Sequence, residues 1–319
     1  MKLLITYKLS DESIDILSNI GFDVHNITIS QNQLINYVNE NKFEAIIIGK
    51  NLVINNLLID NCKDLKLIVC AFNNITNVDE TYAKSKSISV LKTEKASSIA
   101  EAELVFAHLF SMVRFLHQTN REMPLEGDMR FNELSNHFSK GKELKGKTLG
   151  VIGFNQTEKE IVKIAIGLGM NVIVSSSNVK EKNIELHFFD GQTVNFNIIT
   201  QPIEILFKNS DFITIHEHIN DDKEICLNDI EKMKNGVGII NVCRAGLINE
   251  VDLINAIDSK KVAYAALDVF EKQPKPEIQI LMNPEISLSP NISNKTIEIQ
   301  HKIENELIKK IKTFKDKTK

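Results

Sequence analysis

The stretch Leu149–Ala165 constrains the fold of this chain more than any other. It opens with a short apolar run, breaks at a polar turn, and resumes with apolar residues at helical spacing. This pattern predicts a strand, a tight turn and an amphipathic helix, which open a dinucleotide-binding βαβ unit. Such a unit carries G-x-G-x-x-G, whose glycines turn the chain, admit a pyrophosphate and let helix and strand pack closely. Here the three positions are Gly153, Asn155 and Glu158, so two of the three glycines are replaced.

The size and charge of the chain exclude several classes of protein. A length of 319 residues exceeds what one core supports, so we expect two domains. The net charge of −4 and the dispersed lysines disfavour a nucleic-acid surface. No apolar run approaches the roughly 18 residues of a membrane helix, and the N-terminus lacks a signal-peptide cleavage pattern. We therefore expect a cytoplasmic protein that binds neither nucleic acid nor membrane.

The cysteines and arginines carry further information. Cys62, Cys70, Cys226 and Cys243 lie far apart without C-x-x-C spacing, so we expect reduced thiols and no metal site. Only four of the 38 basic residues are arginine, and Ile, Asn and Lys are abundant, which suggests drift toward A+T-rich codons. A retained arginine, such as Arg244, is therefore a candidate functional residue.

The pattern of apolar runs predicts an α/β protein of two doubly wound domains, Rossmann-like or flavodoxin-like, with a cleft between them. Residues 1–95 alternate short strands and helices. A largely apolar helix from Ile99 to about Glu122 should be buried in a domain or subunit interface. Polar, loop-like sequence follows from Pro124 to Lys147.

A regular alternation of strands and helices then fills residues 98–285, interrupted by a hairpin signal at Asp190-Gly191. The run Ile286–Ser289 and a final helix, Thr296–Phe314, are expected to return to the first domain. The predicted domains are therefore 1–97 plus 286–319, and 98–285.

Several motifs together make the chain resemble the NAD-dependent D-2-hydroxyacid dehydrogenases, and specifically the short bacterial D-3-phosphoglycerate dehydrogenases. The resemblance covers almost the whole chain. It is carried by Ala102–Val105, Met112–Asp128, Leu144–Gly150, Phe188–Gln192, Asn241–Gly246 and Ala266–Glu271. It implies a substrate-binding domain made from both chain ends, a central NAD-binding domain, and a homodimer built through the helix and loop of residues 100–145. It also implies a small phosphorylated hydroxy acid as substrate.

The mechanism implied by the resemblance needs an arginine, a histidine and a glutamate. Arg244 matches the arginine that fixes the substrate carboxylate. The glutamate position is Gln273, and the histidine position is Asn291. An amide forms hydrogen bonds but does not exchange a proton near neutral pH, so acid–base catalysis worth about 3–5 kcal/mol of barrier is expected to be lost.

The cofactor positions implied by the resemblance also differ in part. Asn155 and Glu158 crowd the pyrophosphate turn, Gln156 replaces an arginine, and Ser176 replaces the acid that holds the adenosine ribose. The candidate cofactor-binding residues are Gly153, Asn155, Gln156, Thr157, Ser176, Val242, Cys243 and Asp268.

These observations leave alternatives open for individual residues. Arg244 is either a substrate ligand or part of a structural ion pair, and Gly153 either meets a phosphate or only turns the chain. Asn291 and Gln273 are either working groups or vestiges. His218 is a lesser candidate for a substitute base, and Cys243 is either oxidisable or an inert thiol.

The function has alternatives as well. The first is an NAD-dependent 2-hydroxyacid oxidoreductase with impaired activity. The second is a catalytically dead pseudoenzyme that binds a partner subunit or a metabolite. The third is a decaying gene product without a selected role.

Overall fold

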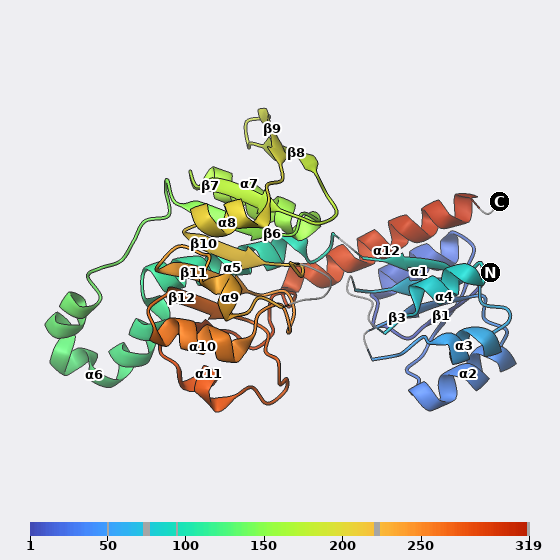
Figure 1. Ribbon diagram of the computed structural model, residues 1–319. Helices are drawn as coiled ribbons and strands as arrows, with labels where there is room; N and C mark the ends of the chain where they lie inside the picture. Colours follow the sequence, from blue (N-terminus) through green and yellow to red (C-terminus); the bar gives the residue numbers. More distant parts are fainter. Residues whose placement is uncertain (50, 73–76, 94, 220–223, 318–319) are drawn as a thin grey trace. The chain divides into compact units, whose positions relative to one another are not determined.

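The computed structural model describes residues 1–49, 51–72, 77–93, 95–219 and 224–317. The chain forms two compact units, drawn in Figure 1. The first unit joins Met1–Ser97 to Thr296–Lys319, and the second is the continuous segment Ser98–Lys295. Among the described residues, no helix is both long enough and apolar enough to cross a bilayer.

The first unit is a parallel sheet with helices around it. Its strands lie in the order β2-β1-β3-β4-β5, with bounds β1 (Lys2–Ile5), β2 (Asp23–Asn26), β3 (Ala45–Ile48), β4 (Leu67–Cys70) and β5 (Ser89–Lys92). Its helices are α1 (Asp11–Asn19), α2 (Gln31–Glu40), α3 (Asn56–Asn61), α4 (Glu80–Ser85) and α12 (Ile297–Lys317). The strands β3 and β4 are buried throughout, as expected for apolar runs in a parallel sheet covered on both faces.

The long helix α12 is an integral part of the first unit. It buries Leu307 and Ile311. Its buried carboxylate, Glu304, accepts a hydrogen bond of 2.6 Å from the Ser13 hydroxyl and another from the hydroxyl of Ser10, the N-cap of α1. The end of the chain is thereby tied to its beginning.

The second unit is built on a parallel sheet in the order β13-β12-β11-β10-β6-β7. Its helices and strands are α5 (Ser98–Val113), α6 (Leu116–His137), β6 (Thr148–Ile152), α7 (Gln156–Gly167), β7 (Asn171–Ser175), β8 (Glu181–His187), β9 (Thr193–Ile199), α8 (Ile203–Asn209), β10 (Phe212–Ile215), α9 (Leu227–Ile230), β11 (Val237–Asn241), α10 (Glu250–Asp258), β12 (Val262–Leu267), α11 (Ile278–Met282) and β13 (Ile286–Leu288). The strands β8 and β9 form a separate antiparallel hairpin. The two sheets confirm the predicted α/β, doubly wound fold class.

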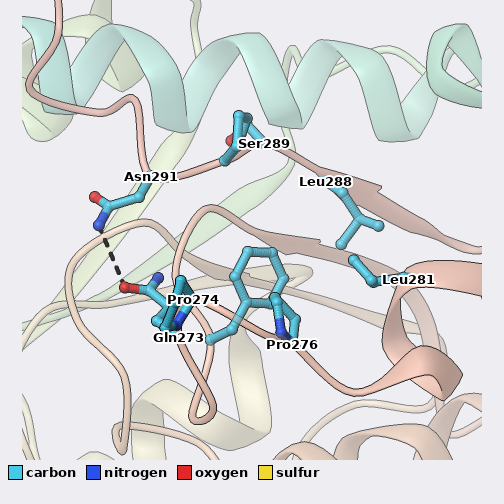
Figure 2. Close-up of a pocket in the computed structure, with 9 residues that line it drawn as sticks. Gln273, Pro274, Pro276, Leu281, Leu288, Ser289 and Asn291 are labelled. Carbon is cyan, nitrogen blue, oxygen red and sulfur yellow. Dashed lines mark hydrogen bonds between the residues drawn. The ribbon is translucent and has the colours of Figure 1, made fainter.

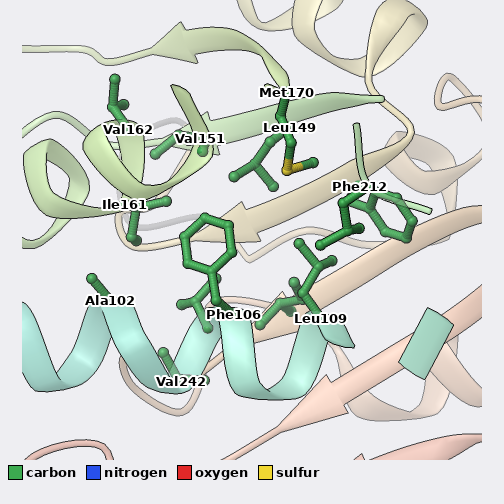
Figure 3. Packing of buried hydrophobic residues seen from close by; sticks show 14 of the residues in the cluster. Ala102, Phe106, Leu109, Leu149, Val151, Ile161, Val162, Met170, Phe212 and Val242 are labelled. Carbon is green, nitrogen blue, oxygen red and sulfur yellow. The ribbon is translucent and has the colours of Figure 1, made fainter. Parts of the chain in front are cut away.

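The apolar helix α5 covers one face of the second sheet (Figure 3). Ala102, Phe106 and Leu109 are buried with the β6 side chains of Leu149 and Val151. The predicted burial is correct for α5, and the surface that buries α5 includes the sheet of its own unit. The single helix predicted to reach about Glu122 is instead interrupted at Phe115, whose left-handed backbone separates α5 from α6.

Two further expectations are wrong. The loop predicted from Pro124 is largely helical, because α6 continues through Pro124 to His137 with a kink at Arg130. Proline leaves the carbonyl of Asn120 without its helical donor, and water can replace that donor because Asn120 is exposed. Figure 1 shows α6 extending from the layers of the second unit.

The predicted domain boundary at 285/286 is the second error. Ile286–Leu288 pairs in parallel with Ala265–Leu267, which makes β13 the edge strand of the second sheet. The chain enters the first unit again at Thr296. A three-residue apolar strand carries no sign of which sheet it joins, since that choice depends on long-range pairing.

We predict that Gly150→Ala destabilises the second unit. An added Cβ on β6 would lie 2.5 Å from Ser210 Oγ and 2.7 Å from Leu206 Cδ2, because α8 packs directly on this strand. The free energy of unfolding should fall by about 1–3 kcal/mol in urea denaturation. The control Gly167→Ala, where no atom lies within 4 Å of the new Cβ, should leave it unchanged or raise it by up to about 1 kcal/mol. Equal changes in the two variants would contradict this packing.

Candidate functional site

The candidate site lies along one edge of the second sheet. All its strands are parallel, so their carboxyl ends meet there, and the strand order reverses between β6 and β10, where ligands bind in such sheets. With about 4.8 Å between strands, the edge from β7 to β13 spans about 24 Å. In spatial order, it carries Ser176, Gly153, His216 with Glu217, Cys243 with Arg244, Asp268 and Asn291.

A buried carboxylate shapes one end of this edge. Asp268 is 0% exposed, and its two oxygens accept hydrogen bonds of 2.9 Å from the backbone N–H groups of Ile292 and Ser293. The Ser289 hydroxyl donates to the same carboxylate at 2.5 Å, and the Asn291 N–H donates to the Asp268 carbonyl at 2.8 Å. Asp268 therefore fixes the turn that carries Asn291, while its own contact with a cofactor stays a prediction.

A buried histidine extends this network. The Ser287 hydroxyl lies 2.9 Å from His108 Nδ1, and Ser289 Oγ lies 2.8 Å from Nε2. Since Ser289 donates to Asp268, it accepts from Nε2–H, so Nδ1 is the acceptor for Ser287. Burial lowers the pKa of His108 to about 4 despite the opposing charge of Asp268, so its imidazole is neutral at pH 7.

The two amides predicted at the acid–base positions do lie together (Figure 2). Asn291 Nδ2 donates to Gln273 Oε1 at 3.4 Å, and both residues are exposed. The loop carrying Gln273 is anchored to α10 by paired contacts: Glu250 N–H donates to Glu271 Oε1 at 2.9 Å, and Glu271 N–H donates to Glu250 Oε1 at 2.8 Å. The arrangement holds a polar pair in place that can bind a hydroxyl group but transfers no proton near pH 7.

A pocket of about 500 Å³ opens beside this amide pair (Figure 2). It is lined by Phe270, Gln273, Pro274, Pro276, Leu281, Leu288, Ser289, Pro290 and Asn291. These walls are mostly apolar and include neither lysine nor arginine. The pocket therefore suits an apolar group and offers no charge for a phosphate.

Arg244 and Cys243 follow β11 at the centre of the edge. Among the described residues, no carboxylate forms an ion pair with the Arg244 guanidinium, and only its backbone carbonyl is held, by Asn241 Nδ2 at 2.9 Å. This favours a ligand role over a structural ion pair. Cys243 is exposed to solvent. The protein atoms packed around its thiol, together with the Glu101 and Glu158 carboxylates, nevertheless raise its pKa to about 12, so the thiol is protonated at pH 7. The neighbouring Val242 has a buried side chain.

The turn after β6 is closed by the chain's own carboxylate. Gly153 has φ +108°, a conformation that favours glycine. Buried Glu158 Oε2 accepts a hydrogen bond of 2.6 Å from the Asn155 N–H and so caps α7 from within. Burial raises the pKa of Glu158, while backbone N–H donors and Lys182 oppose the rise. The anionic group at the N-terminus of α7 is therefore a side chain of the chain itself, Glu158.

His216 is packed behind this turn. Its Nε2 lies 2.8 Å from Thr214 Oγ1, and its Nδ1 lies 3.8 Å from Glu158 Oε1. Burial lowers the pKa of His216 to about 4, so the ring is neutral at pH 7 and its contact with Glu158 is not an ion pair there. The suggestion that His218 acts as a base stays a prediction.

The remaining predicted cofactor residues lie on α7 and after β7. Thr157 is buried and donates to Glu101 Oε2 at 2.7 Å, whereas Gln156 is only partly buried at the start of α7. Ser176 Oγ donates to Glu217 Oε2 at 3.4 Å, so a carboxylate is present there after all.

Two charged residues at the turn were missed from the sequence. Glu217 Oε1 also accepts from the Ser177 N–H at 2.9 Å, and the Lys182 ammonium donates to the Phe154 carbonyl. These pairs are separated by 40 and 28 residues in the chain. No local sequence pattern reveals these contacts. The sequence shows only that a lysine, Lys182, lies near the start of a predicted hairpin strand. Across the described ranges, no group of His, Cys, Asp and Glu side chains could hold a metal ion.

Comparisons with known proteins agree with this geometry. Residues 106–293 match the family model described as "D-isomer specific 2-hydroxyacid dehydrogenase, NAD binding domain". A hydroxypyruvate reductase of Thermotoga maritima is 34% identical over 259 residues, which is 80% of this chain and 79% of that protein. A D-3-phosphoglycerate dehydrogenase of Archaeoglobus fulgidus is 31% identical over 94% of this chain, which spans only 54% of that enzyme. Among solved structures, apo D-mandelate dehydrogenase of Rhodotorula graminis has a TM-score of 0.83 at 21% identity, covering 98% of this chain and 94% of that one, and so shares the fold.

The neutral state of His108 predicts a pH dependence of stability. Its folded pKa of about 4 lies below the ordinary 6.5, so the unfolded chain binds the proton more strongly between these values. Stability from this group is complete above pH 6.5 and is lost as pH falls toward 4, by up to about 3 kcal/mol. Urea denaturation of His108→Gln at pH 4.5–7 should show a flatter dependence than the native chain. The control His187→Gln, on the exposed hairpin, should keep the pH dependence of the native chain. If His108→Gln also kept it, the neutral state assigned to His108 would be refuted.

Proposed function

This chain belongs to the D-isomer specific 2-hydroxyacid dehydrogenases and contains their NAD-binding domain, and from this premise we propose that it is an NAD-linked 2-hydroxyacid oxidoreductase with impaired proton transfer. The observation that carries the proposal is the contact between Asn291 and Gln273 at the acid–base positions. The same edge of the sheet carries Arg244, which has no ion-pair partner among the described residues. NAD, when bound, supplies the hydride acceptor. Arg244 and Asn291 of the second unit would then hold the substrate.

The residues of the edge fit a dinucleotide. Gly153 turns the chain at the switch point, and the Glu217 carboxylate stands at the end of β7, where a ribose acceptor is needed. The pyrophosphate position differs, because Glu158 caps α7. We propose that this carboxylate is displaced on binding, which lowers the affinity without abolishing it.

Arg244 would bind the substrate carboxylate, since a guanidinium matches that group with two parallel hydrogen bonds. Asn291 would hold the 2-hydroxyl through its amide, and water would have to exchange the proton. The resulting loss of acid–base catalysis corresponds to a rate lowered about 10²–10⁴-fold. D-3-phosphoglycerate, the entry to serine synthesis, stays the first candidate substrate. The pocket beside Asn291 offers no charge for its phosphate, which would have to bind elsewhere.

A pseudoenzyme is the second candidate. It is favoured by the coincidence that the substitutions fall on Gln273, Asn291 and the pyrophosphate turn while the packing of the sheet is regular. In that case the fold would bind a partner subunit or a metabolite. The cytoplasm stays the predicted location for either function.

We further propose a homodimer formed through residues 100–145. On α6, Leu125, Met129 and Phe131 are 80%, 86% and 60% exposed, and Leu134 is the buried residue of this helix. Apolar side chains exposed along one helix call for a covering surface. A second copy of α5 and α6 would provide that surface.

Restoring the acid–base pair should restore catalysis. Asn291 has φ +54°, a conformation that histidine tolerates better than most residues, so Asn291→His is compatible with the turn. The double variant Asn291→His/Gln273→Glu should raise kcat at least about 10²-fold, measured as NADH formation at high enzyme concentration. D-3-phosphoglycerate and D-glycerate form a matched pair that tests the phosphate. The pseudoenzyme is favoured if neither the native chain nor the double variant turns over either substrate.

The dimer is tested by removing the apolar residues of α6. The native chain should sediment at twice the mass of one chain, and Leu125→Ser/Met129→Ser/Phe131→Ser should sediment as a monomer. Phe189→Ser, which removes a still more exposed aromatic residue from the hairpin tip, should stay dimeric. A monomeric native chain would rule out this assembly.

A further inference from the structure

The hairpin β8–β9 brings a cation to the turn that follows β6. Ile184 on β8 is buried in the same core cluster as Ile161 and Val162 of α7, so the hairpin is held against this helix. Figure 1 shows it beside α7 and β7. Lys182, two residues before Ile184 on the same face of β8, donates to the Phe154 carbonyl and lies 5.2 Å above the Phe154 ring.

The charges around Lys182 form a site that suits an anion. The Glu158 carboxylate of the chain itself occupies this site. Burial and the neighbouring Lys159 lower the pKa of Lys182, while the Glu158 and Glu217 carboxylates act in the opposite direction. Glu158 takes the place of an anion at the α7 N-terminus, where the pyrophosphate of a dinucleotide binds in this type of sheet. A pyrophosphate that replaced this carboxylate would meet both the helix N-terminus and the Lys182 ammonium.

Glu217 supplies the negative charge that is missing at Ser176, the position of the ribose-binding acidic residue. In βαβ units that bind NAD, an acidic residue about 20 positions after the first glycine accepts hydrogen bonds from the adenosine ribose. That position is Ser176 here, and Glu217 reaches it from the end of β10, past the end of β6. The Ser177 N–H, at 2.9 Å, fixes its carboxylate. A carboxylate at this point accepts from a ribose diol and repels a 2′-phosphate.

We propose that Lys182 and Glu217 are the dinucleotide-binding residues that replace the lost motif: Lys182 for the pyrophosphate and Glu217 for the adenosine ribose, with selection of NAD over NADP. This inference rests on the proposed NAD-linked function. The match of residues 106–293, which include Lys182 and Glu217, to the NAD-binding family model supports the same site independently.

The test is a titration of NADH and of NADPH with the full chain, followed by cofactor fluorescence. The chain has no tryptophan, so protein emission does not interfere. Lys182→Gln should raise the Kd for both cofactors about tenfold and flatten its dependence on salt, and Lys182→Arg should recover most of the affinity. Lys180→Gln, an exposed lysine two positions earlier, is the control and should bind like the native chain.

Replacing the carboxylates of Glu217 and Glu158 should change the Kd for NADH in opposite directions. Glu217→Gln should raise the Kd for NADH severalfold and lower the NADPH-to-NADH ratio of Kd values. Glu158→Gln should lower the Kd, because it keeps an acceptor for the Asn155 N–H while removing the competing charge. A structural role for these side chains would not produce opposite signs.

The outcomes separate the two proposals. Native binding of NADH with unchanged affinities in Lys182→Gln and Glu217→Gln would overturn this inference and leave the NAD-linked function standing. No saturable binding of NADH by the native chain at millimolar concentration would overturn both.

Discussion

Parallel strand pairing is the constraint on which the site depends. Because every strand of the second sheet runs in the same direction, its chemistry can collect only at the carboxyl edge, from β7 at one side to β13 at the other. This explains how residues as distant in sequence as Gly153 and Asn291 belong to one site. It also explains why β13 matters, since its pairing with β12 carries Asn291 into the NAD-binding unit.

Two buried carboxylates at this edge have opposite consequences. Asp268 has its hydrogen bonds satisfied by the turn that follows β13, so burying it produces a rigid support for Asn291. Glu158 is satisfied by the turn that follows β6, and thereby fills a place suited to an anionic ligand. The turn that carries Asn291 thus keeps its buried support, while the N-terminus of α7 is capped by the chain's own Glu158 carboxylate. Loss of function by random decay would not be expected to leave both networks fully paired.

The sequence predicts the architecture well where a local pattern determines it. The strand, turn and helix predicted for Leu149–Ala165 are present as β6 and α7, and the hairpin predicted at Asp190-Gly191 is present as β8 and β9, because apolar runs and a turn signal mark these elements locally. No local pattern predicts the edge strand β2, because Asp23–Asn26 contains no apolar run. In the site, the pairing of Asn291 with Gln273 follows from the motif. The contacts of Lys182 and Glu217 do not, because side chains from separate strands meet only after the whole sheet has formed.

The discontinuity of the first unit has a consequence for how the chain folds during synthesis. The second unit is one continuous segment and has all its strands once residue 295 has left the ribosome. The first unit must wait, since α12 supplies Glu304, Leu307 and Ile311 to its interior and comes after the entire second unit. Residues 1–97 therefore emerge first and stay without their last helix until the whole second unit has been made, so their core is the last to be completed.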